Sequence, residues 1–81
     1  MRVTVRFFAS HREATGLSTY VAEVPDGSSV ADVLRSLYRP FPKLEFASGS
    51  VAFAVNRNQV NPATPLRDGD ELALLPPMAG G

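Results

Sequence analysis

The sequence predicts an α+β domain in which a single mixed β-sheet is covered on one face by one main helix. Three observations support this fold class. The chain opens with an alternation of polar and apolar residues, its clearest amphipathic segment has helical spacing, and three strand-like segments follow that segment. With 81 residues, of which 44% are hydrophobic, the chain suits a single domain.

Two strands are predicted before the helix, over residues 2–8 and around residues 19–24, because their apolar residues alternate along the chain. The segment between them lacks this alternation and is expected to form a short helical turn closed by Gly16. His11 lies in this segment and is expected to be a surface loop residue. As the only histidine of the chain, it cannot assemble a histidine metal cluster or a proton relay.

The main helix is predicted to begin at Ser29, with Asp32 three positions on as an acidic capping partner. Its apolar residues fall at helical spacing: Val30, Val33, Leu34, Leu37 and Tyr38. Two prolines end it, Pro40 and Pro42. Capping explains the hydroxyl groups at this helix start better than a catalytic nucleophile does. Residues 41–50 are expected to be a loop with a helical turn.

Three strands are predicted after the helix, over residues 51–55, 59–60 and 71–75, with turns between them. The turn before the last strand is rich in acidic residues: Asp68, Asp70 and Glu71. A calcium loop needs more oxygen ligands at regular alternate positions, so we interpret this cluster as a turn and predict no metal site.

One sheet face is expected to carry no helix and to be unusually apolar, with Phe8, Ala52, Ala54, Ala73 and Leu75 on it. Ordinary scatter of apolar surface accounts for the alanines. Large side chains are the usual anchors of interfaces, so Phe8 and Leu75 favour a protein-binding face. We predict a partner interface made of Phe8, Leu75, Ala73 and Ala54.

The last six residues are expected to form a tail, because consecutive prolines cannot continue a strand ladder. They are small or apolar throughout: Pro76, Pro77, Met78, Ala79, Gly80 and Gly81. The chain is therefore divided into a domain over residues 1–75 and an extended C-terminal tail over residues 76–81.

The Gly81 carboxylate is the predicted reactive group. Six extended residues reach roughly 20 Å, enough to enter the active site of a partner. Glycine lacks a Cβ atom, so a narrow channel can close around the backbone at Gly80 and Gly81. A carboxylate is a poor acyl donor, and a separate enzyme is needed to activate it. No residue of the chain itself is predicted to be catalytic.

Composition argues against several classes of partner. The formal net charge is zero, without the basic footprint of a nucleic-acid-binding protein. There is no cysteine for a disulfide framework or a thiolate metal site. No apolar run has the length of a transmembrane helix or the form of a signal peptide, so no membrane partner and a cytoplasmic location are expected.

The sequence resembles the ubiquitin-like sulfur carriers, most closely the branch that serves molybdopterin synthase. The likeness covers essentially the whole chain. It is carried by Phe7-Phe8-Ala9 followed by Arg12-Glu13-Ala14 and Gly16, by Val55-Asn56, by Pro65-Leu66 with Asp68-Gly69-Asp70-Glu71, and by the ending Pro76-Pro77-Met78-Ala79-Gly80-Gly81.

This resemblance implies a β-grasp fold and a role for Gly81. An ATP-dependent adenylating enzyme would convert Gly81 to glycyl-AMP, and a persulfide sulfur donor would turn it into a thiocarboxylate. The tail would then enter the large subunit of molybdopterin synthase, where sulfur passes to a pterin precursor to form the dithiolene. The chain would hold no permanently bound cofactor. By the same resemblance, Phe8, Leu75 and Met78 would lie on the surface that binds the partner.

Three alternatives remain open on these residues. A carrier for another pathway, such as thiamine, tRNA thiolation or cysteine synthesis, shares the fold and the Gly-Gly end. A ubiquitin-like binding module would use the open sheet face without its tail. A protein modifier would use the same Gly81 to form an amide with a lysine.

Overall fold

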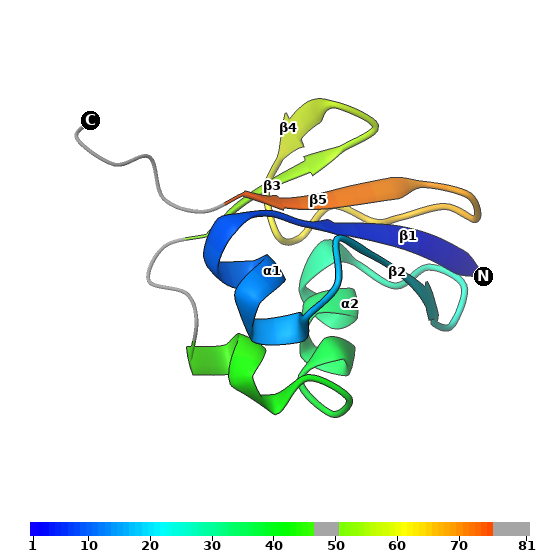
Figure 1. Ribbon diagram of the computed structural model, residues 1–81. Helices are drawn as coiled ribbons and strands as arrows, with labels where there is room; N and C mark the ends of the chain where they lie inside the picture. Colours follow the sequence, from blue (N-terminus) through cyan, green and yellow to red (C-terminus); the bar gives the residue numbers. More distant parts are fainter. Residues whose placement is uncertain (47–50, 76–81) are drawn as a thin grey trace.

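A five-stranded sheet in the order β2-β1-β5-β3-β4 forms one layer of the structure, and the helices form the other (Figure 1). The computed structural model describes residues 1–46 and 51–75. Its strands are β1 (Arg2–Phe7), β2 (Thr19–Glu23), β3 (Ala52–Val55), β4 (Asn58–Val60) and β5 (Glu71–Leu75). Its helices are α1 (Ala9–Thr15), α2 (Val30–Leu37) and the 3-10 helix η1 (Pro42–Phe46). The predicted fold class is confirmed, and so is the predicted succession of strands and main helix along the chain.

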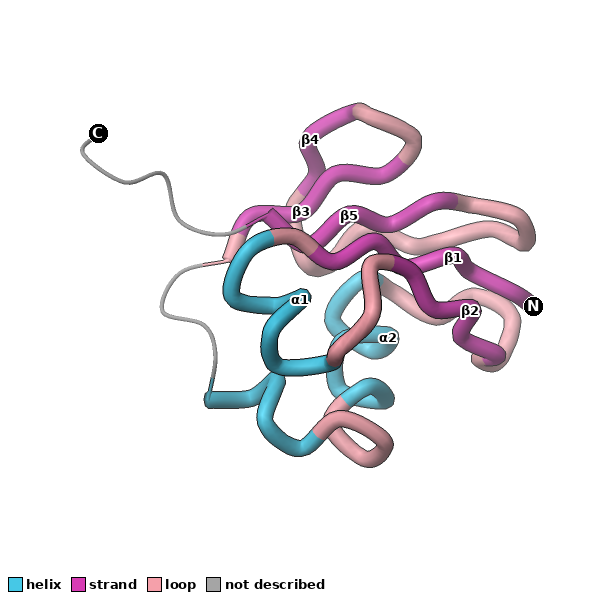
Figure 2. The backbone as a smooth tube through the Cα atoms, viewed as in Figure 1, coloured by secondary structure: helices cyan, strands magenta, loops and turns pink. Residues whose placement is uncertain are grey.

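The first and last strands lie side by side in the middle of the sheet (Figure 2). They run parallel, with Thr4 opposite Glu71 and Phe7 opposite Leu74. The other three neighbouring pairs of strands are antiparallel. Parallel neighbours require a long crossover between them, and here that crossover includes α2. The sheet is therefore mixed, as predicted.

Helix α2 begins at the capping box that the sequence predicts. The Asp32 N–H donates to Ser29 Oγ at 3.2 Å, and the Ser29 N–H donates to the Asp32 carboxylate at 3.0 Å. The hydrogen bond from the Ser29 backbone lowers the pKa of the Asp32 carboxyl below its ordinary value. Ser28 Oγ donates to the Pro25 carbonyl at 2.7 Å, so both serine hydroxyls have structural roles.

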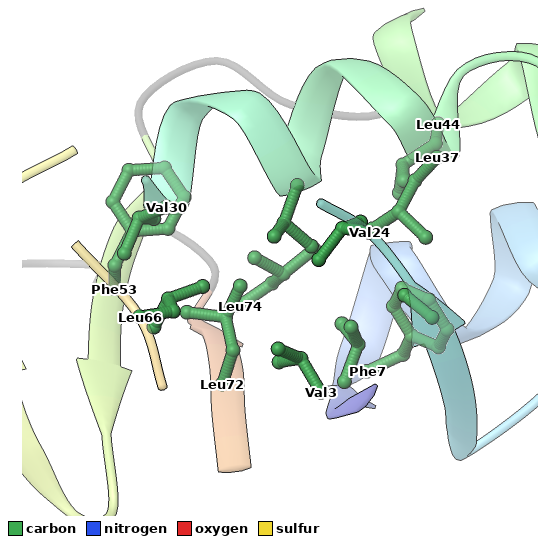
Figure 3. Close-up of a cluster of buried hydrophobic side chains, with 13 residues drawn as sticks. Val3, Phe7, Val24, Val30, Leu37, Leu44, Phe53, Leu66, Leu72 and Leu74 are labelled. Carbon is green, nitrogen blue, oxygen red and sulfur yellow. The ribbon is translucent and has the colours of Figure 1, made fainter. Parts of the chain in front are cut away.

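A single hydrophobic core lies between α2 and the sheet (Figure 3). Leu66 enters it from a loop, because the Leu66 N–H donates to the Ser28 carbonyl at 2.9 Å and draws the loop against the start of α2. Leu44 enters it from η1. The buried members are Val3, Val5, Phe7, Ala22, Val24, Val30, Val33, Leu37, Leu44, Phe53, Leu66, Leu72 and Leu74.

The expectation that His11 is a surface loop residue is wrong. The segment forms α1, which ends at Gly16 as predicted, with φ 74° at that glycine. This helix packs against β1 and η1, and the packing leaves His11 only 1% exposed. A seven-residue helix is too short to show an apolar period in the sequence. The sequence also did not predict η1 as a distinct element, so the packing partner that buries His11 was missed.

The acidic residues around Gly69 form a turn, as predicted. Gly69 has φ 87°, a left-handed value that glycine adopts without strain. The Asp70 carboxylate accepts from the Arg67 N–H at 2.8 Å and from Asn56 Nδ2 at 3.0 Å. Asn56 Oδ1 accepts in turn from the Glu71 N–H at 3.0 Å. These hydrogen bonds connect the residue after β3 with the start of β5, so the carboxylate and amide groups have a structural role.

Candidate functional site

The face of the sheet that carries no helix has an apolar end, which we call the open-face patch. Strand register brings its members together, since Ala52 lies opposite Leu75 and Ala54 lies opposite Ala73. Each of these side chains is half-buried. With Phe8, the open-face patch consists of Phe8, Ala52, Ala54, Ala73 and Leu75, and it contains all four residues of the predicted interface.

Phe8 joins the open-face patch because the backbone stays extended after β1. Its φ of −130° and ψ of 152° continue the strand alternation, so its side chain points away from the core face that Phe7 occupies. Phe7 lies opposite Leu74, which places Phe8 near Leu75 at the end of β5. The Arg6 guanidinium carbon lies 5.6 Å from the centre of the Phe8 ring, within cation–π range.

Beyond the open-face patch, this face carries ion pairs together with the exposed side chain of Val21, whereas the sequence interpretation treated the face as apolar. Arg6 Nη1 lies 3.4 Å from Glu71 Oε1, and Arg2 Nε lies 3.1 Å from Glu23 Oε1. Period-2 spacing from Phe8 already places Arg6 on this face, so the signal was present in the sequence. The open face is therefore graded, with apolar side chains at one end and ion pairs at the other.

The predicted tail lies outside the described residues. This applies to Pro76, Pro77, Met78, Ala79, Gly80 and Gly81, whose roles stay predictions. Strand β5 ends at Leu75, immediately before the tail. The open-face patch therefore includes the last residue of β5, six positions before Gly81 in the sequence.

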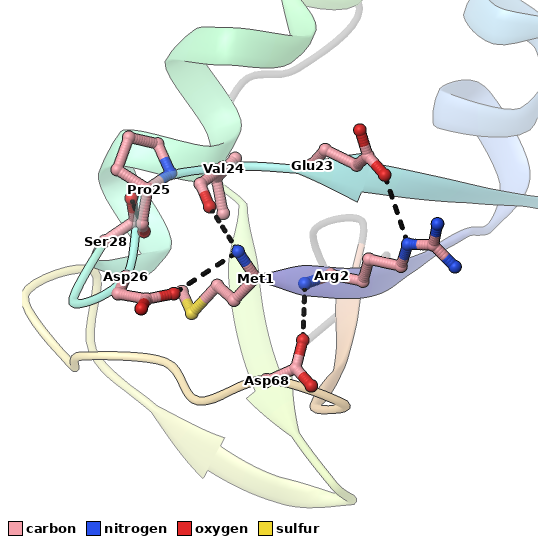
Figure 4. A network of polar contacts seen from close by, with 8 residues as sticks. All are labelled: Met1, Arg2, Glu23, Val24, Pro25, Asp26, Ser28 and Asp68. Atoms are coloured by element: carbon pink, nitrogen blue, oxygen red, sulfur yellow. Dashed lines mark hydrogen bonds and ion pairs between the residues drawn. The ribbon is translucent and has the colours of Figure 1, made fainter.

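A second surface feature, at the other end of β1, is a depression of about 510 Å³ lined by Met1, Arg2, Glu23 and Asp68 (Figure 4). Its polar groups bond to one another. The Arg2 N–H donates to Asp68 Oδ1 at 2.7 Å, and the Arg2 side chain pairs with Glu23. We therefore assign this depression a structural role.

Neither a metal centre nor a membrane span emerges from the described part of the chain. Within residues 1–46 and 51–75, no three His, Asp or Glu side chains are arranged to hold a metal ion. No helix in those ranges has both the length and the apolar character needed to cross a membrane.

Residues 5–81 match the ThiS family. The chain belongs to the ThiS family. This ThiS-family chain is 35% identical over 83 residues to a protein of Chlamydomonas reinhardtii named molybdopterin synthase sulfur carrier subunit, and the alignment covers 100% of both chains.

Two solved structures resemble this ThiS-family fold. The small archaeal modifier protein 1 of Haloferax volcanii has a TM-score of 0.88 at 26% identity, covering 95% of this chain and 98% of the other. A chain from the complex of subunits 1 and 2 of the molybdopterin-converting factor of Helicobacter pylori has a TM-score of 0.69 at 32% identity, covering 100% of both chains. The ubiquitin-like β-grasp fold implied by the resemblance is confirmed.

Proposed function

We propose that this chain is the sulfur-carrier subunit of a molybdopterin synthase, and that its Gly81 carboxylate becomes the thiocarboxylate that donates sulfur. The observation that carries the proposal is the position of the open-face patch. The patch ends at Leu75, so a partner that binds it also meets the chain where it leads to Gly81. The full-length relative named molybdopterin synthase sulfur carrier subunit supports this choice of pathway.

The chemistry begins with a carboxylate that must be made into an acyl donor. A carboxylate oxygen of Gly81 attacks the α-phosphorus of ATP in an adenylating enzyme, and pyrophosphate leaves. The resulting mixed anhydride is attacked by the terminal sulfur of a persulfide. A C–S bond forms, AMP leaves, and a thiol then cleaves the S–S bond to leave the thiocarboxylate. This chain contributes the acyl group, since it has no cysteine of its own.

The last step takes place in the large subunit. The open-face patch supplies the apolar contact, and burial of Phe8 and Leu75 against the partner drives association. The tail then places the thiocarboxylate sulfur at the pterin precursor. The acids and bases for this step belong to the large subunit, so the carrier acts as a substrate-bearing subunit.

Mass spectrometry of the intact chain tests the reaction. Incubation with the adenylating enzyme, ATP and a persulfide source is expected to replace one oxygen by sulfur, confined to Gly81. A variant without Gly80 and Gly81 is the control and is expected to gain no sulfur. An unchanged mass of the full chain, with binding to the large subunit unaffected by the deletion, overturns the carrier function and favours a binding module.

Transfer to the pterin precursor tests the pathway. The thiocarboxylate form, mixed with the large subunit and the precursor, is expected to yield molybdopterin. If a thiocarboxylate forms but no molybdopterin appears, the chain carries sulfur for a different pathway.

A protein modifier is the second candidate, favoured by the structural likeness to the small archaeal modifier protein 1. It uses the same activated Gly81 but forms an amide with a lysine. The two candidates differ in product, because a modifier leaves Gly81 bonded to nitrogen and a carrier leaves it bonded to sulfur.

A further inference from the structure

Amine groups are scarce in this chain. Of its eight basic residues, Lys43 is the single lysine and the rest are arginine. A guanidinium stays protonated in proteins and does not act as a nucleophile. There is no cysteine, and a hydroxyl needs an adjacent general base to attack an acyl group. The imidazole of His11 is only 1% exposed, so the remaining nitrogen nucleophiles are the Lys43 side chain and the α-amine of Met1.

The α-amine of Met1 is occupied in the folded domain (Figure 4). It donates to the Val24 carbonyl at 2.8 Å and lies 3.3 Å from the Asp26 carboxylate. Both contacts join the start of β1 to the chain that follows β2. Attack by this nitrogen would require the loss of both contacts, so folding withdraws it from reaction.

The side chain of Lys43, unlike the α-amine of Met1, faces solvent. It is exposed on η1, and within the residues that the structure describes it forms no ion pair. Its neighbour Leu44 is only 1% exposed, and the Leu44 N–H donates to the Phe41 carbonyl at 3.0 Å. The segment that carries Lys43 is thus anchored to the core while the amine faces solvent.

The layers of the fold separate Lys43 from the open-face patch. Helix η1 belongs to the helical layer (Figure 1). The open-face patch lies on the sheet face that is turned away from the core. A partner confined to the open-face patch therefore does not cover Lys43.

We propose that Lys43 accepts the Gly81 acyl group from a second, activated copy of this chain. The inference rests on the proposed activation of Gly81 as glycyl-AMP. The neutral ε-amine of Lys43 attacks the glycyl carbonyl carbon, a C–N bond forms, and the C–O bond to AMP breaks. AMP leaves with the electron pair, and the nitrogen loses one proton to water. The product is an amide that joins two copies of the chain, and its formation competes with sulfur transfer.

The experiment uses the full chain in two parallel reactions with the adenylating enzyme and ATP. One reaction contains the persulfide source and the other does not. Without sulfur, a covalent dimer is expected, and peptide mass mapping is expected to place its bond between Gly81 and Lys43. Lys43→Arg keeps the charge, removes the nucleophile, and is expected to lose the dimer. Arg39→Gln removes a nearby exposed charge, keeps the amine, and is expected to retain the dimer.

Each other outcome overturns the proposal. A dimer that persists in Lys43→Arg, or a bond mapped to Met1, shows a different acceptor. A thiocarboxylate in the first reaction with no dimer in the second overturns the Lys43 acceptor and leaves the sulfur-carrier function standing. Failure of both reactions overturns the activation of Gly81, and the acceptor role with it.

Discussion

His11 is the residue at which burial and acid–base chemistry conflict. Its side chain is 1% exposed, and among the described residues its Nδ1 has no hydrogen-bond partner. An unpaired buried polar atom costs about 1–3 kcal/mol. Burial also lowers the pKa of His11 below its ordinary value of 6.5, because a charged imidazole loses its hydration there. Folding therefore disfavours the charged form of this histidine.

This burial predicts a stability that depends on pH. Just below the ordinary pKa of 6.5, the unfolded chain binds a proton at His11 more readily than the folded domain does. The free energy of unfolding is expected to fall as the pH drops through this range, by up to about 1.4 kcal/mol per pH unit. Above it, both states are neutral and the effect disappears. Urea unfolding at a series of pH values measures this slope.

His11→Leu supplies the comparison for this pH dependence. Leucine is apolar and does not titrate, so the variant is expected to lose the part of the slope that begins as the pH falls below 6.5, while the carboxylates affect both chains alike. Equal slopes in the two proteins would show that His11 does not cause the pH dependence.

Among the elements, the hairpin between β3 and β4 contains an unusual turn. Val55 lies opposite Asn58, so Asn56 and Arg57 form a two-residue turn with φ values of 50° and 72°. Two positive φ values are the signature of a type I′ turn, which favours glycine at the second position. Arg57 occupies that position, and the left-handed conformation costs a residue with a Cβ roughly 1–2 kcal/mol.

Arg57→Gly is therefore expected to stabilise the domain by about 0.5–1 kcal/mol, since relief of strain exceeds the added freedom of the unfolded chain. Thermal unfolding measures the change. Arg67→Gly is the matched control, because Arg67 is an exposed arginine without a positive φ, and it is expected to destabilise. A lower unfolding temperature for Arg57→Gly would show that the turn stores no relievable strain.

Local sequence signals predicted the elements well where one physical rule acted alone. The pair Ser29 and Asp32 predicted the start of a helix. The turn at Asp68-Gly69-Asp70 accounted for its acidic residues without a metal site. His11 could not be placed in this way, because its burial depends on α1 and η1 meeting across the fold. The open-face patch was predicted from period-2 alternation, whereas the pairing of Arg6 with Glu71 needed the parallel register of β1 and β5.

For the whole molecule, the graded open face predicts where a partner gains its binding energy. Phe8→Ala is expected to weaken binding to the proposed partner, the large subunit, by roughly 2 kcal/mol, about thirtyfold, because it removes the largest apolar side chain of the open-face patch. Isothermal titration calorimetry measures the affinity, and circular dichroism checks that the fold is retained.

Val21→Ala is the matched control for the whole-molecule prediction. Val21 is 54% exposed on β2, and it lies opposite Thr4, away from the open-face patch. Its truncation is expected to leave the affinity nearly unchanged. If the two variants weaken binding equally, the partner covers the whole open face and the gradient has no role in recognition.

The central place of β5 also determines how the domain responds to mechanical force. A partner that grips the tail pulls on Leu75 along the axis of a strand paired on both sides, with β1 and with β3. Such a load shears the flanking hydrogen bonds together, and they resist it collectively. A strand at the edge of a sheet, or one peeled from its end, would yield bond by bond. Extraction of the tail from a partner is thus expected to proceed with the domain still folded.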